Sequence, residues 1–330
     1  MTNPGQPAFG RVRAGLATRP VVGAPAGRRQ APEVVLELHR FTDAADFYGR
    51  AEGFLLTDEA QHNLIIGICA SLRQGRDYTA HAPYLATVQD GDGVVAAAIR
   101  TPPYNLLLSL VRTPDEAATR RALALIAADA RREYGTLPGV QGAAAVSRAF
   151  AELWHRRTGQ PVRKEVALRV FQLETVTPVS GVPGALRRAT AADRDLLIRW
   201  LAAFDRETLG GPDPRAVESR VDARLDSPLG GLYLWEDGRP VSMAGYGGPT
   251  PNGIRVAPVY TPPEHRGRGY ASACVAALSQ LLLDGGRRYC FLFTDQANPT
   301  SDKIYQAIGY RPVGDVDQYA FLPHPEPART

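Results

Sequence analysis

The stretch Arg266-Gly267-Arg268-Gly269-Tyr270-Ala271 is the most informative part of this chain. It follows the apolar run 254–260 and a proline-marked corner, Thr261-Pro262-Pro263, and it opens the helix-like run 271–283. Glycines let a backbone approach a ligand closely, and the first turn of a helix leaves amide N–H groups unpaired. Those amides and the positive end of the helix dipole favour a phosphate group. The segment therefore predicts a phosphate-binding loop.

Two familiar phosphate-binding motifs do not fit this segment. A Rossmann fingerprint needs Gly-x-Gly-x-x-Gly directly after a strand, whereas Ser272 takes the third glycine position and a corner separates strand from loop. A Walker A loop needs a Gly-Lys-Ser/Thr ending, which the segment lacks. Taken alone, the six residues still leave open an ordinary glycine-rich turn with two solvated arginines.

A second motif follows the next predicted strand, 289–294. It reads Asn298-Pro299-Thr300-Ser301-Asp302-Lys303-Ile304-Tyr305-Gln306-Ala307-Ile308-Gly309-Tyr310. Together the two segments resemble the GNAT superfamily of acyl-CoA-dependent N-acetyltransferases. The phosphate motif of that family is Arg/Gln-x-x-Gly-x-Gly/Ala, and its second motif shares the asparagine, the tyrosine and the Gly-aromatic ending. The resemblance is close over residues 185–322 and only topological over 33–175.

Residues 185–322 are expected to form the catalytic domain. The predicted order of elements is β-α-α-β-β-β-α-β-α-β, which indicates a mixed α/β sheet. Thr190 and Asp193 form an acidic variant of a capping box, and Asp237-Gly238 predicts a hairpin turn. The preceding run, 177–184, is rich in proline and glycine and is typical of a linker or an exposed crossover.

Residues 33–177 follow a similar order more faintly, around a hairpin predicted at Asp90-Gly91-Asp92-Gly93 and with two consecutive helices predicted at 114–134 and 144–157. In place of the glycine loop they have Arg112-Thr113-Pro114-Asp115-Glu116, whose two carboxylates would repel a phosphate. We interpret them as a degenerate GNAT-like domain in a tandem arrangement. The resemblance implies two mixed, mostly antiparallel sheets flanked by helices, one in each half.

The resemblance also implies how acetyl-CoA, the expected co-substrate, is bound. Loop amides would bind its pyrophosphate, helped by two arginines and a serine hydroxyl, and Asn298 would bond its pantetheine arm. The strand before the loop would point an amide at the thioester carbonyl; Pro258 has no N–H, so this amide would come from Val259 or Tyr260. The expected donor-binding residues are Val259, Tyr260, Arg266, Gly267, Arg268, Gly269, Tyr270, Ala271, Ser272 and Asn298.

The expected catalytic residues are Tyr305 and Glu207. By the resemblance, Tyr305 would be the general acid for the departing thiolate, because a phenol can give up a proton at neutral pH. The general base is less well defined. Glu207, after the first helix of the second half, is the leading carboxylate on the acceptor side. Glu264 could instead pair with Arg266. His265 could also be a base, but it is expected in a solvent-facing turn.

Composition excludes several other classes of protein. The net charge of +4 is a mild excess that does not imply a nucleic-acid partner, and part of it lies in the arginine-rich segment 1–32. That segment is expected to be a disordered tail rather than a secretory signal, and no stretch approaches the length of a membrane span. The three cysteines have no zinc-binding spacing and suit a reducing cytoplasm. We expect a cytoplasmic protein without metal, membrane or nucleic-acid partners.

The leading hypothesis is an N-acetyltransferase that acts on the primary amine of a small molecule. One alternative is a non-catalytic acyl-CoA binding or regulatory protein, and another is an acetyltransferase acting on protein amino groups. A nucleic-acid binder would rest on the arginine-rich tail alone, without interleaved aromatic residues or a known module. The first half could shape the acceptor pocket, bury the edge of the second sheet or regulate activity. The oligomeric state stays open.

Overall fold

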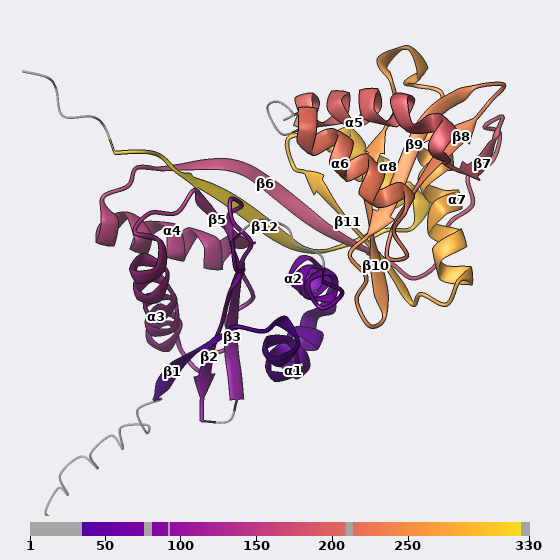
Figure 1. Ribbon diagram of the computed structural model, residues 1–330. Coiled ribbons are helices and arrows are strands. Elements are labelled where there is room, and N and C mark those ends of the chain that lie inside the picture. The colour runs from indigo at the N-terminus through magenta and orange to yellow at the C-terminus, as the bar shows by residue number, and fades with distance from the viewer. Residues whose placement is uncertain (1–34, 76–80, 92, 209–213, 325–330) are drawn as a thin grey trace, which may run out of the picture. The chain divides into compact units, whose positions relative to one another are not determined.

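Figure 1 shows the computed structural model, which describes residues 35–75, 81–91, 93–208 and 214–324. The arginine-rich tail lies outside the described residues, so its disorder stays a prediction. The described strands form a twelve-stranded sheet with the order β1-β2-β3-β4-β5-β12-β6-β11-β10-β9-β8-β7. The predicted fold class, a mixed α/β fold with a mostly antiparallel sheet flanked by helices, is confirmed.

The same order of elements occurs twice along the chain. The first series is β1 (Leu36–Phe41), α1 (Ala44–Leu55), η1 (Leu56–Asp58), α2 (Glu59–Leu72), β2 (Tyr84–Asp90), β3 (Gly93–Arg100), β4 (Leu106–Leu108), α3 (Glu116–Tyr134), β5 (Gly139–Ala143), α4 (Ala144–Thr158) and β6 (Val162–Leu173). The second series is β7 (Ala185–Arg188), η2 (Ala191–Asp193), α5 (Arg194–Thr208), α6 (Pro214–Leu225), β8 (Gly231–Glu236), β9 (Pro240–Gly247), β10 (Gly253–Tyr260), η3 (Pro263–His265), α7 (Tyr270–Asp284), β11 (Tyr289–Asp295), α8 (Pro299–Ile308) and β12 (Arg311–Phe321).

Local sequence signals account for several boundaries of these elements. The capping box before α5 is confirmed. The Asp193 carboxylate accepts a hydrogen bond from the Thr190 amide at 2.8 Å, and the Thr190 side chain accepts one from the Asp193 amide. The turn at Asp237-Gly238 joins β8 to β9, and Gly238 has φ +67°. These short-range interactions depend only on residues close in sequence.

Strand β5 was missed by the sequence analysis, and its glycines explain why. Two of its five residues are glycine, which is a poor strand former. A Cβ at Gly142 would lie 2.9 Å from the Leu108 carbonyl oxygen, and one at Gly139 would collide with the Tyr319 carbonyl. The glycines are needed because neighbouring backbones pass close to β5.

The last strand, β12, joins the two halves into one sheet. It lies between β5 and β6, antiparallel to both, with Val316 opposite Ala143 on one side and opposite Leu168 on the other. Strand β6 in turn pairs with β11 of the second series. The two separate sheets expected from the sequence are therefore continuous, because the strand that ends the second series is inserted into the first.

Apolar side chains are buried on both faces of the sheet. Helices α3 and α4 cover one face of the first half and α1 and α2 the other, whereas α7 and α8 lie opposite α5 and α6 in the second half. In the first half, the ring of Trp154 stacks on Phe150 and on Phe321, with centroids 6.0 and 5.7 Å apart. Phe321 belongs to β12, so the inserted strand also contributes to this core.

The segment predicted as a linker packs against the second half. Val176, Val179 and Val182 contact its core, and the Trp235 indole N–H donates to the Pro183 carbonyl at 2.8 Å. Residues 176–183 are thus held by apolar contacts as well as by a hydrogen bond.

Candidate active site

Strands β10 and β11 run parallel and separate after a short paired stretch. Residues 253–255 pair with 289–291, and the described part of the sheet contains no further pairing between these strands. Beyond it, β10 follows β9 past a bulge between Val256 and Val259, while β11 follows β6 as far as Asp295. The two facing edges therefore present backbone groups that an extended ligand can pair with.

The two residues predicted to supply the oxyanion donor lie at the end of β10. Val259 is opposite Ala244 of β9, and Tyr260 is opposite Met243. Successive residues of a strand direct their N–H groups to opposite edges, so one of these two amides points away from β9 and toward the separated edge. The preceding residue, Pro258, has no N–H, so the donor on this edge is restricted to the strand end.

The predicted phosphate loop connects β10 to α7 and is open above its backbone. Gly267 and Gly269 have φ of +75° and +80°, a region that favours glycine. A Cβ at Gly267 would meet no atom within 4 Å, whereas one at Gly269 would lie 2.8 Å from Val182 Cγ2. The first glycine thus leaves the loop exposed to a ligand, and the second lets it pack on the 176–183 segment.

The start of α7 leaves its amides available to an anion. Gly269 is the N-cap residue and provides no side-chain cap. The first hydrogen bond of the helix runs from the Ala273 amide to the Gly269 carbonyl at 3.0 Å. The amides of Tyr270, Ala271 and Ser272 therefore have no acceptor within the helix, and the helix dipole is positive at this end.

Helix α3, at the corresponding place in the first half, begins differently. Asp115 is its N-cap residue, and its carboxylate accepts the Ala118 amide at 2.7 Å. A carboxylate of the protein itself thus occupies the position where an anion would meet the helix start. These residues fit an anionic ligand at α7 and not at α3.

Arg266, predicted to face the phosphate, points instead toward α5. Its Nη2 atom donates to both carboxylate oxygens of Glu207, at 2.9 and 2.8 Å, and its Nε atom donates to the Thr261 carbonyl at 2.8 Å. The guanidinium also lies over the Tyr260 ring, 5.7 Å from its centroid. The structure therefore brings the proposed base and one of the proposed phosphate arginines into contact.

At this corner the structure decides against one alternative, the pairing of Glu264 with Arg266, and the expectation for His265 is wrong. Glu207, and not Glu264, is the carboxylate that Arg266 contacts among the described ion pairs. His265, expected in a solvent-facing turn, is 7% exposed and packs edge-on against the Tyr270 ring. Its Nδ1 atom is buried without a hydrogen-bond partner in the described structure. The short η3 turn explains both findings, because it directs residue 265 inward and residue 266 toward α5.

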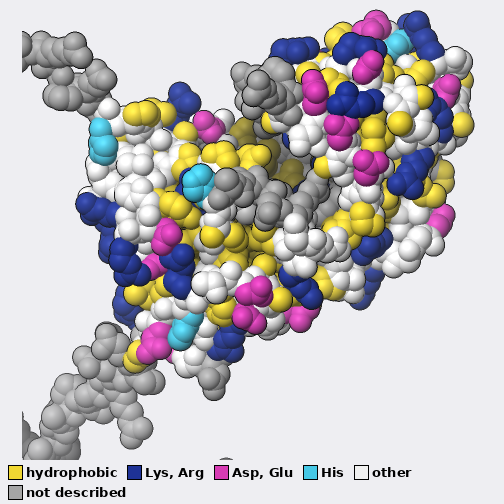
Figure 2. Space-filling model, in the orientation of Figure 1, with side chains coloured by type: hydrophobic (Ala, Val, Ile, Leu, Met, Phe, Trp, Pro, Cys, Tyr) yellow, Lys and Arg dark blue, Asp and Glu magenta, His cyan; other side chains and the backbone are white. Residues whose placement is uncertain are grey.

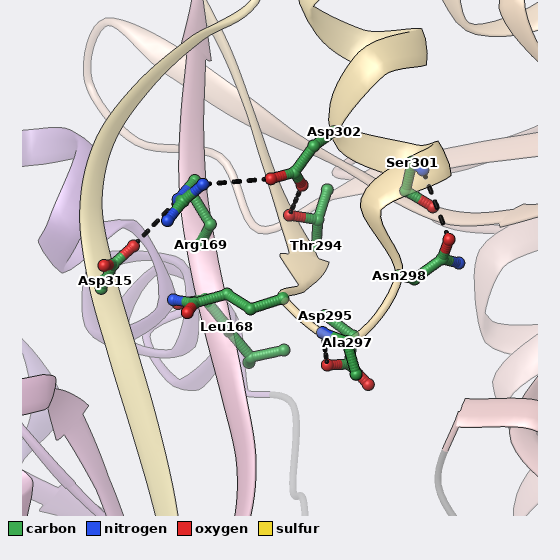
Figure 3. A network of polar contacts seen from close by, with 10 residues as sticks. Leu168, Arg169, Thr294, Asp295, Ala297, Asn298, Ser301, Asp302 and Asp315 are labelled. Atoms are coloured by element: carbon green, nitrogen blue, oxygen red, sulfur yellow. Dashed lines mark hydrogen bonds and ion pairs between the residues drawn. The ribbon is translucent and has the colours of Figure 1, made fainter.

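Helix α8 carries the other two predicted residues. Asn298 is its N-cap residue and accepts the Ser301 amide through its side-chain oxygen at 3.4 Å (Figure 3). Tyr305 packs on the core beside α7, with its ring edge-on to Tyr310 and the centroids 5.9 Å apart. Burial, with a smaller contribution from Cys274, raises the pKa of Tyr305, so the phenol keeps its proton at neutral pH.

A network that the sequence analysis did not find fixes α8 on the sheet (Figure 3). Asp302 of α8 accepts hydrogen bonds from Thr294 of β11 at 2.6 Å and from Arg169 of β6 at 3.2 Å. Arg169 also donates to Asp315 of β12 at 3.1 Å. Asp302 lies within the second motif, but Arg169 is 133 residues away in the chain, so nothing in the local pattern indicates it.

Other features of the described residues concern metals, thiols and charge. They contain no cluster of side chains suited to a metal ion, and all three cysteines are buried and free. No helix among them is both long and apolar enough to cross a bilayer.

Basic and acidic side chains are interspersed on the face in Figure 2, and pairs such as Arg194 with Asp222 neutralise one another.

One known protein family matches the part of the chain that contains this site. Residues 195–310 match the model of the acetyltransferase (GNAT) family. Residues 195–310 form a GNAT-family domain. This is a family of acyltransferases. The matched region of the chain contains the separated strands β10 and β11, the open loop and α8. No protein of curated function matches the chain.

Solved structures share the fold across both halves. A GCN5-related N-acetyltransferase from Sphaerobacter thermophilus is 16% identical, covering 91% of this chain and 100% of its own, with a TM-score of 0.59. A tandem GNAT protein from the clavulanic acid biosynthesis pathway is 14% identical, covering 88% and 100%, with a TM-score of 0.56. A Drosophila protein is 12% identical, covering 87% and 98%, with a TM-score of 0.61.

Proposed function

We propose that the chain is an N-acetyltransferase that moves the acetyl group of acetyl-CoA to the primary amine of a small molecule within a ternary complex. One observation carries the proposal: β10, which separates from β11 beyond residue 255, is followed through a short corner and loop by the open, uncapped start of α7. An extended arm that ends in a pyrophosphate needs this combination of a free strand edge and an anion site.

The donor would be held mainly by backbone groups. The amides of residues 267–272 would bind the pyrophosphate, and the exposed Arg268 would add charge. The free edge of β10 would pair with the pantetheine arm, and the Asn298 side-chain amide would bond it from α8. The family match at residues 195–310 supports this placement, because it covers all of these segments.

Bound acetyl-CoA supplies a thioester whose carbonyl carbon is attacked by the amine, so that a C–N bond forms and the C–S bond breaks. The amide of Val259 or Tyr260 would donate to the carbonyl oxygen as negative charge develops there. Tyr305 would give its proton to the departing sulfur. Glu207 would accept the proton that the amine loses, directly or through water.

The first half would be a degenerate copy without a donor site, spanning residues 33–177, and the catalytic domain would span 185–322. The Asp115 carboxylate at the start of α3 supports this assignment, because it takes the place that a pyrophosphate would need. We infer that one acetyl-CoA binds each chain.

The test is release of free thiol from acetyl-CoA with a panel of amines, namely amino acids, polyamines, aminoglycosides and a lysine-containing peptide. Thiol release with a small amine, and its loss in Tyr305→Phe with acetyl-CoA binding retained, supports the proposal. Tight acetyl-CoA binding without thiol release for any amine would contradict it and indicate a binding protein. Turnover of the peptide alone would assign a protein acceptor instead.

A further inference from the structure

The two arginines of the glycine loop have different surroundings. Arg268 stands between the two glycines of positive φ, is exposed, and makes no ion pair with the described carboxylates. Arg266 donates from Nε to the Thr261 carbonyl and from Nη2 to the Glu207 carboxylate. Arg268 therefore has the Tyr270 phenol as a neighbour and no carboxylate partner among the described residues, whereas the charge of Arg266 is already paired with Glu207.

Glu207 lies in the last turn of α5, where a carboxylate faces the negative end of the helix dipole. A cation beside it offsets this unfavourable position. Asp205, two residues earlier, is 2% exposed and pairs with Arg220 of α6, so it serves packing. The Glu207 side chain is 45% exposed and lies beside Tyr260, the last residue of β10, where its carboxylate can meet a molecule from solvent.

The first half contains a similar pair although it lacks the phosphate loop. Arg112 precedes α3 as Arg266 precedes α7, and its Nη2 atom lies 3.9 Å from the Asp58 carboxylate, at the end of the α1–η1 segment. An arginine at this place therefore contacts a carboxylate that follows the first helix even where no glycine loop exists. The contact does not depend on phosphate binding.

We propose that Arg266 is a positioning residue on the acceptor side of the site: it holds the Glu207 carboxylate beside the thioester end of β10, while Arg268 is the arginine that serves the phosphate. The inference rests on the proposed acetyltransferase function. One sequence motif would thus serve two substrates. The glycines and Arg268 would bind acetyl-CoA, and Arg266 would act on the amine side through Glu207.

Four variants test this division: Arg266→Gln, Arg266→Lys, Arg268→Gln and Glu207→Gln. Acetyl-CoA affinity is measured by calorimetry, and turnover with the amine found in the panel. We expect Arg268→Gln to raise the acetyl-CoA Kd about tenfold through the lost charge-assisted bond. Arg266→Gln should leave that Kd within about twofold of wild type but lower kcat/KM for the amine about tenfold or more. Arg266→Lys, which keeps the cation, should restore most of the loss.

A double variant separates positioning from a general structural role. If Arg266 acts through Glu207, then adding Arg266→Gln to Glu207→Gln causes no further loss of kcat/KM. Losses that multiply, or an acetyl-CoA Kd that rises as much in Arg266→Gln as in Arg268→Gln, overturn the proposal.

Failure of the proposed function would remain distinguishable from failure of this inference. If wild type acetylates no amine, the acetyl-CoA Kd values alone test which arginine serves the phosphate. A Kd that rises only in Arg268→Gln supports the assignment of Arg268 to the phosphate, and equal rises in Arg268→Gln and Arg266→Gln contradict it. Thermal melting of every variant identifies any loss that comes from unfolding.

Discussion

Replacing Gly267 by alanine tests the phosphate loop directly. The residue has φ +75°, a conformation that costs a residue with a Cβ about 1–2 kcal/mol, and the added Cβ would meet no atom within 4 Å. The free energy of unfolding should therefore fall by about 1–2 kcal/mol, lowering the melting temperature by a few degrees. Gly135, after α3, has φ +69° and equally open surroundings. Gly135→Ala is therefore a control that adds the same methyl group at another open position of positive φ, away from the loop.

The two variants should differ in their affinity for acetyl-CoA. A methyl group at position 267 would stand over the amides proposed to bind the pyrophosphate. Loss of one hydrogen bond to a charged group, about 1.5–3 kcal/mol, raises the Kd about tenfold or more. Calorimetric titration should show this rise for Gly267→Ala, and wild-type affinity for Gly135→Ala. An unchanged Kd in both variants would refute the assignment of the loop.

Four further predictions address other parts of the molecule. Tyr305→Phe should lower kcat about 100-fold, measured by thiol release, with little change in acetyl-CoA Kd. Asp115→Ala removes the cap of α3 and should lower the free energy of unfolding by about 1 kcal/mol in urea titrations, without affecting acetyl-CoA binding. Arg169→Leu releases α8 and should lower kcat about tenfold, whereas Arg163→Leu, at an exposed pair on the same strand, should not. Hydrogen bonds from an arginine of β7 lower the pKa of Asp193 to about 2. Its stabilising contribution is present above the unfolded pKa and is lost as the pH falls toward that value, so Asp193→Asn should weaken the acid dependence of urea unfolding between about pH 5 and pH 2.

Features fixed by neighbouring residues were predictable from the sequence. The glycine loop, the start of α7 and the capping box at Thr190 and Asp193 each depend on residues within one turn of one another. The order of elements in the second half followed in the same way from hydrophobic periodicity and turn residues. The fold class and the family could therefore be stated before the structure.

Contacts between distant residues were not predictable in this way. Arg266 meets Glu207 across 59 residues, and Arg169 meets Asp302 across 133, so no spacing pattern marks either pair. Charge alone suggested the nearer Glu264 as the partner of Arg266. Strand β5 was missed for a related reason, since its glycines are explained only by the backbones that pass beside it.

The position of β12 has a consequence for how the chain is made. Strands β5 and β6 leave a ribosome long before β12, which must lie between them. Until β12 has been made, each has an open edge that could pair with another chain. A fragment ending near residue 177 would keep those edges and lack the Phe321 contact with Trp154. Separate expression of the first half should thus give an aggregating product, and a synthetic β12 peptide should rescue its solubility.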